Sequence, residues 1–396
     1  MNRYIVLIFF TLLLTISFSR TINIWFEYEG GDQLKAIVKE FEKENPSISI
    51  NIIQQKKIPD KLFTVFRGNG DIPDIILIKN DDIGKLIDAG LIENVDDIKN
   101  QIEKNLIQNT FDGFKIEKSG KEHYYGVPFY FDTQVLYYNN KIFNEAGVSL
   151  DDIYSFEDLL LASQVIEEYT KGKVLGFAWG ANSPYWFPPF QWAFGKENLI
   201  ENGRIIINDQ ETLDAVKYIY KAIIKENAYW IERQGLIAGF KSGKIASMFF
   251  GTFMIPDFIK SGMNFKILPL PYIKEAENYM ASILDYKGFS IVKGKKTKDV
   301  EKLIEFILSK EAQIDFCKGL YKFPVNKSAF DELKDKDEYF KVVYESAKRG
   351  KTMPNSSYFK SKYWQGIRTM MTLILNQKEG FNNEIIEKTQ RFMDEK

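Results

Sequence analysis

The chain has 396 residues, a formal net charge of -1 at pH 7 and 27% charged residues. This length predicts two domains, and the near-neutral charge argues against nucleic acid as a partner because no basic surface would attract phosphates. With His123 as the one histidine and Cys317 as the one cysteine, an internal disulfide and a Cys/His zinc site are excluded, together with most hydrolase and redox mechanisms. We expect no metal and no cofactor.

Residues 1–19 have the pattern of a secretory signal peptide. Arg3 is the basic start, an apolar stretch covers 4–16, and small residues precede a cleavage point after Ser19. An uncleaved membrane anchor is the alternative, but the apolar run is shorter than the ~20 residues that a spanning helix needs. No cysteine follows the run, so a lipid anchor is not expected. The pattern predicts a periplasmic or otherwise extracytoplasmic protein whose mature chain begins near Arg20.

The first part of the mature chain alternates between strand and helix patterns. Apolar residues recur at helical spacing in some segments and form short β-rich runs in others. The predicted elements are a strand at 22–26, a helix at 33–43, a strand at 48–53, a helix at 60–66, a strand at 74–78 and a helix at 83–89. This order is typical of an α/β lobe with a mostly parallel sheet.

Two carboxylates, Asp81 and Asp82, stand between the strand at 74–78 and the next helix. We expect at least one of them to cap that helix, because Asp accepts hydrogen bonds from free N–H groups at a helix start. Ligands also bind at the carboxyl ends of strands in α/β sheets. Asp81 and Asp82 are therefore candidate site residues as well.

The segment 123–147 carries a charge inside an apolar run. Gly126-Val127-Pro128 forms a break, and the residues from Phe129 to Tyr138 are nearly all aromatic or β-branched, which predicts one long strand. Asp132 lies in the middle of this strand. An unpaired buried charge is costly, so Asp132 is predicted to be either structurally paired or facing a ligand.

Further elements follow in order. Ser155 and Asp158 predict a capping box for a helix at 156–169. A strand is expected at 176–180, and the aromatic segment 183–189 is predicted to lack regular structure because its prolines have no N–H donor. Tyr185 and Trp186 in this segment form either a stacking surface or a minor core. The remaining predicted elements are a helix at 211–226, strands at 265–268 and 289–292, and a helix at 298–309.

Two further segments provide candidates. Gly243-Lys244 is not a P-loop, because the required upstream glycine and the following Ser or Thr are missing. Phe253, a few residues later, is a candidate aromatic residue of the site. Trp364 and Arg368 are four residues apart on a predicted helix and share one face. An aromatic plane beside a guanidinium suits a flat polyhydroxyl ligand, and a surface cation–π pair is the alternative.

Several motifs in order resemble the family 1 extracellular solute-binding proteins, the substrate receptors of ABC sugar importers. The motifs run through the whole mature chain, and each is weak alone. They are Gly70-Asp71-Ile72-Pro73-Asp74, Gly126-Val127-Pro128 with the Lys141-x-Phe143-x-x-Ala146-Gly147 helix, the segment from Phe240 to Phe253, Ser309-x-Glu311-x-Gln313 and Met353-Pro354-Asn355. In the segment from Phe240 the chain departs from the family pattern, since Ser247 is inserted and Phe253 replaces a usual Trp.

The resemblance implies an α/β, two-lobed Venus-flytrap fold of the type II periplasmic binding proteins. It places the lobes at 20–131 plus 287–331 and at 132–286 plus 332–396, with crossings near 132–135, 284–287 and 330–335. It implies a receptor that captures a sugar, an oligosaccharide of the maltose or maltodextrin type, and delivers it to ABC permease subunits. We expect a monomer that binds without chemistry.

The resemblance also supports the site. The expected ligand-binding residues are Asp81, Asp82, Asp132, Tyr185, Phe253, Trp364 and Arg368, and weaker candidates are Glu27, Tyr28, Glu29 and Trp186. A polyamine receptor of the same fold is the first alternative because of these acids, although Arg368 argues against a cationic ligand. A secreted glycosidase with two carboxylates is the second.

Overall fold

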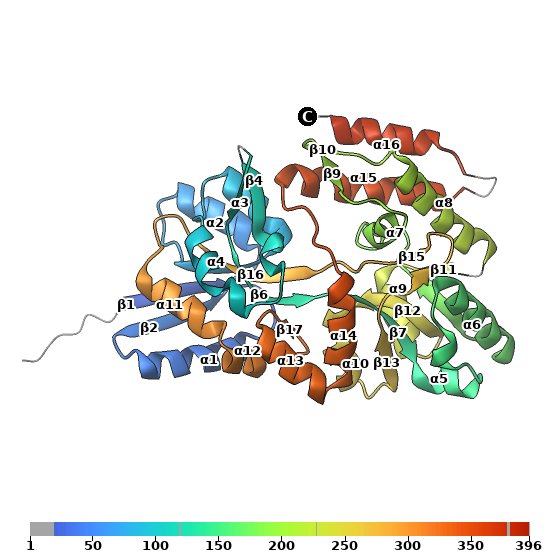
Figure 1. Ribbon diagram of the computed structural model, residues 1–396, viewed down its shortest axis with the longest axis horizontal. Helices are drawn as coiled ribbons and strands as arrows, with labels where there is room; N and C mark the ends of the chain where they lie inside the picture. The colour runs from blue at the N-terminus through green and yellow to red at the C-terminus, as the bar shows by residue number, and fades with distance from the viewer. Residues whose placement is uncertain (1–19, 119, 227, 378–380, 396) are drawn as a thin grey trace, which may run out of the picture.

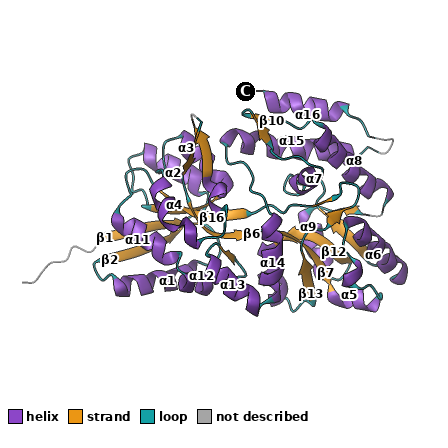
Figure 2. Cartoon of the chain, in the orientation of Figure 1, coloured by secondary structure: helices purple, strands orange, loops and turns teal. Residues whose placement is uncertain are grey.

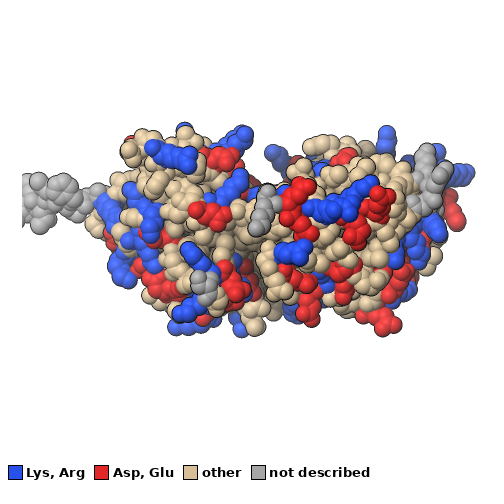
Figure 3. Space-filling model, turned by 90° about the horizontal axis from the view of Figure 1, so that it is seen from above, with Lys and Arg blue, Asp and Glu red and all other residues tan. Residues whose placement is uncertain are grey.

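The computed structural model describes residues 20–118, 120–226, 228–377 and 381–395, so the predicted signal peptide lies outside the described residues. Figure 1 shows two lobes side by side, with several chain segments passing between them. Seen from above, basic and acidic side chains are interspersed over both lobes (Figure 3). Within the described ranges, the structure contains no helix that is long and apolar enough to cross a membrane.

The first lobe is built on a six-stranded mixed sheet with the order β17-β6-β16-β3-β1-β2. Its parallel half pairs β1 with β2 and β3, and its antiparallel half pairs β16 with β3 and β6. The strands are β1 (Arg20–Phe26), β2 (Ile48–Gln54), β3 (Ile75–Lys79), β6 (Val127–Asp132), β16 (Asp285–Ile291) and β17 (Phe323–Pro324). The lobe therefore combines segments that are far apart in the sequence.

Helices cover both faces of this sheet (Figure 2). On one side α1, α11, α12 and α13 pack in series, and on the other side α2 contacts α3. In α1 the predicted apolar stripe of Leu34, Ile37, Val38 and Phe41 is buried, as the helical spacing requires. The elements are α1 (Gly31–Glu44), α2 (Ile58–Arg67), α3 (Ile83–Asp88), α4 (Asp96–Ile102), α11 (Lys298–Ile307), α12 (Lys310–Cys317), α13 (Lys327–Lys336) and the hairpin β4 (Lys115–Lys118) and β5 (Lys121–Tyr124).

The second lobe repeats this design with a five-stranded sheet, ordered β11-β8-β12-β7-β13. Here β8 is parallel to β11 and β12, while β7 is antiparallel to β12 and β13. The strands are β7 (Gln134–Asn139), β8 (Leu175–Trp179), β11 (Tyr229–Trp230), β12 (Ile245–Gly251) and β13 (Phe265–Leu268), and the short hairpins are β9 (Ile200–Glu201) with β10 (Arg204–Ile205) and β14 (Tyr272–Ile273) with β15 (Asn278–Tyr279).

The helices of the second lobe include one that begins with the predicted capping box, in which Ser155 and Asp158 bond to each other's backbone N–H. The longest, α15, lies beside α16 and also contacts α3 of the first lobe. The helices are α5 (Asn140–Glu145), α6 (Phe156–Tyr169), α7 (Phe187–Ala193), α8 (Gln210–Lys225), α9 (Arg233–Lys241), α10 (Ile255–Lys260), α14 (Glu338–Arg349), α15 (Ser357–Leu375) and α16 (Glu384–Asp394).

The long strand predicted at 129–138 is wrong, because the chain changes sheets at Thr133. The Thr133 N–H donates to Thr252 Oγ1 (3.0 Å), and its hydroxyl donates to the Ile283 carbonyl (2.9 Å). The segment before it pairs as β6 in the first sheet, and the segment after it pairs as β7 in the second. Both halves are buried and apolar, so the sequence pattern shows no sign of the change.

The expectation of irregular structure through 183–189 is also wrong at its end. Helix α7 begins at Phe187, and Pro188 and Pro189 occupy its first turn. The N–H groups of a first turn have no partner inside the helix, so proline costs nothing there and its fixed φ favours the helix.

Candidate functional site

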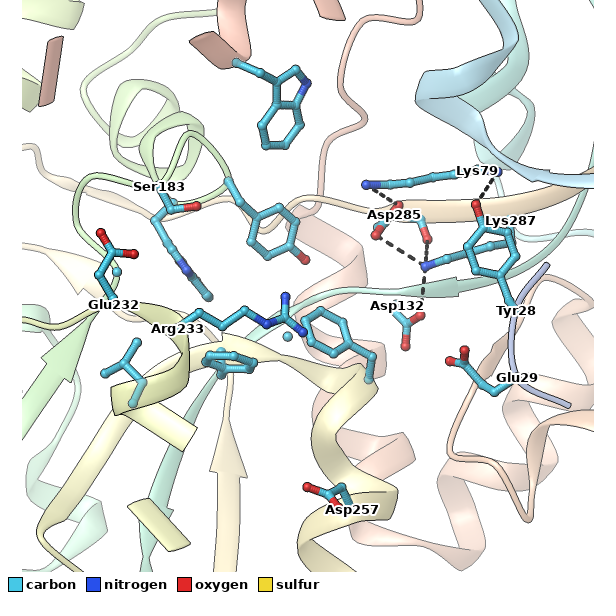
Figure 4. A pocket seen from close by; sticks show the side chains of 18 of the residues that line it. Tyr28, Glu29, Lys79, Asp132, Ser183, Glu232, Arg233, Asp257, Asp285 and Lys287 are labelled. Atoms are coloured by element: carbon cyan, nitrogen blue, oxygen red, sulfur yellow. Dashed lines mark hydrogen bonds and ion pairs between the residues drawn. The ribbon is translucent and has the colours of Figure 1, made fainter. Parts of the chain in front are cut away.

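A cavity of about 760 Å³ lies between the two lobes. Its floor includes the ends of β3, β6 and β12 and the start of β16, and α9 and α15 contribute from the second lobe (Figure 4). The carboxyl ends of parallel strands meet here, which is where α/β sheets place ligands. The cavity brings together these predicted residues: Tyr28, Glu29, Asp132, Tyr185, Trp186, Phe253, Trp364 and Arg368.

Asp132 is paired inside the protein, which is one of the two outcomes expected from the sequence. Its side chain is 1% exposed and accepts hydrogen bonds from the ammonium groups of Lys287 (2.9 Å) and Lys322 (3.1 Å). Burial alone would raise the pKa of Asp132, but these two ammonium groups lower it to about 2. The carboxylate is therefore ionised at neutral pH and held by two cations.

This pair belongs to a longer chain of alternating charges along the floor of the cavity. From Lys287 it continues to Asp285 (3.3 Å) and to Lys79 (3.3 Å), and it ends at Asp81 (3.7 Å), which lies outside the lining of the cavity. At the other end, Lys322 contacts Glu29. Burial would lower the pKa of Lys79 and Lys287, and the neighbouring carboxylates raise both pKa values above the ordinary value. The charges on the floor thus compensate one another.

Sequence reasoning missed Lys79, Lys287 and Lys322, although two of them carried a signal. Lys287 interrupts the buried strand β16, and Lys79 ends the buried strand β3. A charge inside an apolar strand pattern needs a partner, which is the argument that singled out Asp132. Which lysine meets which carboxylate depends on strands that are distant in the sequence.

The structure does not bring Asp81 and Asp82 into the lining of the cavity. Asp82 forms an ion pair with Lys360 on α15, and Asp81 lies 3.4 Å from the same ammonium. The expected helix cap is wrong, because neither side chain bonds to a free N–H at the start of η1 (Asn80–Asp82) or α3. Burial and the charge of Asp81 raise the pKa of Asp82. Both carboxylates link α15 to the first lobe.

Glu27 also lies outside the lining. Its carboxylate accepts hydrogen bonds from the backbone N–H groups of Lys57 (2.9 Å) and Ile58 (3.3 Å), at the start of α2. Its neighbour Tyr28 lines the cavity, and the Tyr28 hydroxyl accepts a hydrogen bond from the Lys79 N–H (3.1 Å).

The aromatic residues gather on the wall formed by the second lobe. Tyr185 and Trp364 are half-buried, whereas Trp186 is 5% exposed and stacks on Phe249 with ring centroids 5.8 Å apart. Trp186 thus serves mainly the core. Among the described residues, the Tyr185 hydroxyl is buried without a hydrogen-bond partner, which leaves it available to a ligand.

Two arginines face the cavity from the same wall. Arg368 lies one helical turn after Trp364 on α15, as the spacing predicts. Arg233, at the start of α9, was missed by sequence reasoning because nothing in its local sequence marks it. Its guanidinium carbon lies 5.1 Å from the centroid of the Phe253 ring. Guanidinium groups here offer hydrogen-bond donors in a fixed planar arrangement.

These features define a class of protein: a two-lobed receptor with a ligand cavity at the junction of its lobes. Groups of three or more metal-ligating side chains are absent from the described part of the chain. The family model described as bacterial extracellular solute-binding protein matches residues 27–314, and the chain belongs to this family.

Individual relatives agree with this assignment. The maltotriose-binding protein of Pyrococcus abyssi is 25% identical over 270 residues, which are 66% of this chain and 56% of the relative. The maltodextrin-binding protein MdxE of Bacillus subtilis is 24% identical over 376 residues, covering 89% of this chain and 84% of the relative. The GacH receptor of Streptomyces glaucescens matches the fold with a TM-score of 0.77 at 21% identity, covering 96% of this chain and all of that structure.

Proposed function

We propose that this chain is the extracytoplasmic receptor of an ABC carbohydrate importer. It captures an oligosaccharide of the maltose or maltodextrin type between its lobes and delivers it to the membrane permease subunits. The observation that carries the proposal is a cavity of about 760 Å³ in which aromatic rings stand beside polar groups that have no hydrogen-bond partner among the described residues. Relatives named for maltotriose and maltodextrin support the ligand class.

Within this proposal the predicted residues divide by role. Tyr185 and Trp364 offer ring faces to the C–H patches of a sugar, while Arg368 donates hydrogen bonds to its hydroxyls. Asp132 acts by holding Lys287 at the floor of the cavity. Phe253 supports the same wall, and Tyr28, Glu29 and Trp186 are weaker contacts. A structural role is favoured for the three remaining carboxylates, because each of them contacts a helix: Asp81 and Asp82 contact α15, and Glu27 contacts the start of α2.

The proposed lobes are 20–131 plus 287–331 and 132–286 plus 332–396, which close on the ligand about the crossings between them. The hydrogen bond from the Thr133 hydroxyl to the Ile283 carbonyl supports a hinge at two of these crossings, since it joins the crossing near 132–135 to the residue just before the crossing near 284–287. Closure presents one surface made from both lobes to the permease. Small-angle X-ray scattering should show a smaller radius of gyration with ligand than without it.

The pairing of charges disfavours the two alternatives. A polyamine needs free carboxylates, but Asp132 and Asp285 are each bound to lysines. A glycosidase needs a general acid whose pKa is raised, whereas the pKa of Asp132 is lowered to about 2. We therefore propose that the protein binds its ligand without catalysis.

Thermal unfolding of the chain from Arg20 onward tests the proposal. Maltose, longer maltodextrins, putrescine and spermidine form the panel, and a ligand at 100 times its Kd should stabilise the protein by about 2.7 kcal/mol. We expect stabilisation by an oligosaccharide and its loss in Trp364→Ala. Tyr169→Ala, at a ring that is 56% exposed on α6, is the matched control. Stabilisation by polyamines alone would contradict the assignment.

The proposal includes secretion through a signal peptide at residues 1–19, removal of that peptide after Ser19, and a monomeric mature protein without a lipid anchor. N-terminal sequencing of the secreted protein should begin at Arg20. Size-exclusion chromatography with light scattering should give the mass of one chain.

A further inference from the structure

Arg233 lies against Phe253, a ring that the family resemblance implies as a ligand contact. Its guanidinium carbon lies 5.1 Å from the Phe253 ring centroid and 5.5 Å from that of Phe250. These distances are typical of cation–π stacking. The guanidinium therefore covers one side of a ring that would otherwise be open to the ligand.

Within the described part of the chain, the guanidinium donors of Arg233 form no hydrogen bond or ion pair. The nearby carboxylates have other partners: Asp257 pairs with Lys241, and Glu232 accepts a hydrogen bond from Asn182 (3.0 Å). The floor carboxylates are bound to lysines. None of these pairs, over the described ranges of the chain, includes Arg233. A guanidinium with several free N–H groups thus faces the cavity (Figure 4).

Other polar groups on this wall are also unused. Among the described residues, the Tyr185 hydroxyl and Asn182 Oδ1 are buried and have no hydrogen-bond partner. Both residues line the same cavity as Arg233. Buried polar groups are nearly always satisfied, so a cluster of unsatisfied ones beside a free guanidinium points to a ligand rich in hydroxyl oxygens.

We infer that Arg233 is a ligand-binding residue that determines specificity in this cavity, and that Phe253 acts by holding it. The stacked guanidinium presents its N–H fork to two neighbouring oxygens of one sugar ring. An uncovered aromatic ring would accept the C–H face of many sugars, whereas the fork requires both oxygens. This inference rests on the proposed function as an oligosaccharide receptor.

A double-mutant cycle tests the inference by calorimetric titration with maltotriose and longer maltodextrins. Arg233→Met keeps an unbranched aliphatic side chain and removes the donors, and Phe253→Leu removes the stacking ring. We expect each variant to lower the affinity about 10- to 100-fold, as for loss of charged hydrogen bonds. The double variant should be no weaker than Arg233→Met, because both changes act through the same contact.

Arg67→Met is the matched control. Arg67 stacks on Phe63 at 4.1 Å on α2, and neither residue lines the cavity. This variant should keep the affinity of the wild type, and circular dichroism should show that every variant is folded.

Two results would overturn the inference. Unchanged or tighter binding by Arg233→Met, with weaker binding by Phe253→Leu, would mean that the arginine only covers the ring in the absence of sugar. Additive losses would mean that Phe253 contacts the sugar directly. Failure of the proposed function is distinguishable, because the wild type would then bind no oligosaccharide of the series.

Discussion

The floor of the cavity and the wall formed by the second lobe use charge in opposite ways. On the floor at the crossing strands, the lysines and carboxylates form one chain of ion pairs, in which Asp132 and Lys287 are almost fully buried. On the wall of the second lobe, Arg233 stacks on an aromatic ring and the Tyr185 hydroxyl has no partner within the described chain. The charges on the floor compensate one another, and our proposal assigns ligand recognition to the other wall.

Asp132→Asn should have the largest effect on this comparison. The variant leaves Lys287 and Lys322 buried with less compensating charge, so we expect a loss of about 3–5 kcal/mol in the free energy of unfolding. Urea denaturation measures it. Asp257→Asn, at an exposed ion pair with Lys241, should cost less than about 1 kcal/mol. Equal losses of unfolding free energy in the two variants would mean that the buried ion pairs on the floor stabilise the protein no more than an exposed ion pair does.

The pH dependence of unfolding should be the next largest effect. The pKa of Asp132 is about 2 in the folded protein and lies below its ordinary value, so its stabilisation is complete above about pH 4 and is lost as the pH falls through 2. The difference in stability between the wild type and Asp132→Asn should therefore shrink by about 2 kcal/mol over this range. A constant difference would show that the ion pairs do not hold this carboxylate ionised.

Tyr185→Phe should separate stability from binding. Removing a buried hydroxyl that lacks a partner should leave the free energy of unfolding unchanged or raise it by about 1 kcal/mol. The affinity for an oligosaccharide should fall about 5- to 10-fold, since the ligand loses one hydrogen bond. Denaturation and calorimetry of the same preparation provide both values. A stability loss without any change in affinity would place the hydroxyl in the core.

Asp82→Asn should have the smallest effect. The residue lies outside the cavity and pairs with Lys360, so we expect less than about threefold change in affinity and about 1 kcal/mol or less in stability. Lys360→Met, which removes the other partner, should behave in the same way. A tenfold loss of affinity in Asp82→Asn alone would return this carboxylate to the ligand site, as the family resemblance implied.

Much of the fold followed from local patterns. The spacing of Leu34, Ile37, Val38 and Phe41 predicted α1, and the Ser155 box predicted the start of α6. The local pattern gives no sign of the change of sheets at Thr133, because β6 and β7 are equally apolar and buried. Only the family resemblance implied a crossing near 132–135. The prolines that begin α7 were misinterpreted, since proline interrupts a helix interior but suits its first turn.

By itself, the sequence determined most of the elements, the family resemblance, and the aromatic candidates together with one of the two arginines in the cavity, because periodicity and motif order are local properties. The tertiary structure decided the pairing of charges: it placed Lys322 and Lys287 on Asp132, Lys360 on Asp82, and Arg233 against Phe253. These contacts join residues that are far apart in the chain, except for the last pair. A charged residue inside an apolar pattern can be recognised from the local sequence. Which residue pairs with it depends on the packing of distant strands and helices.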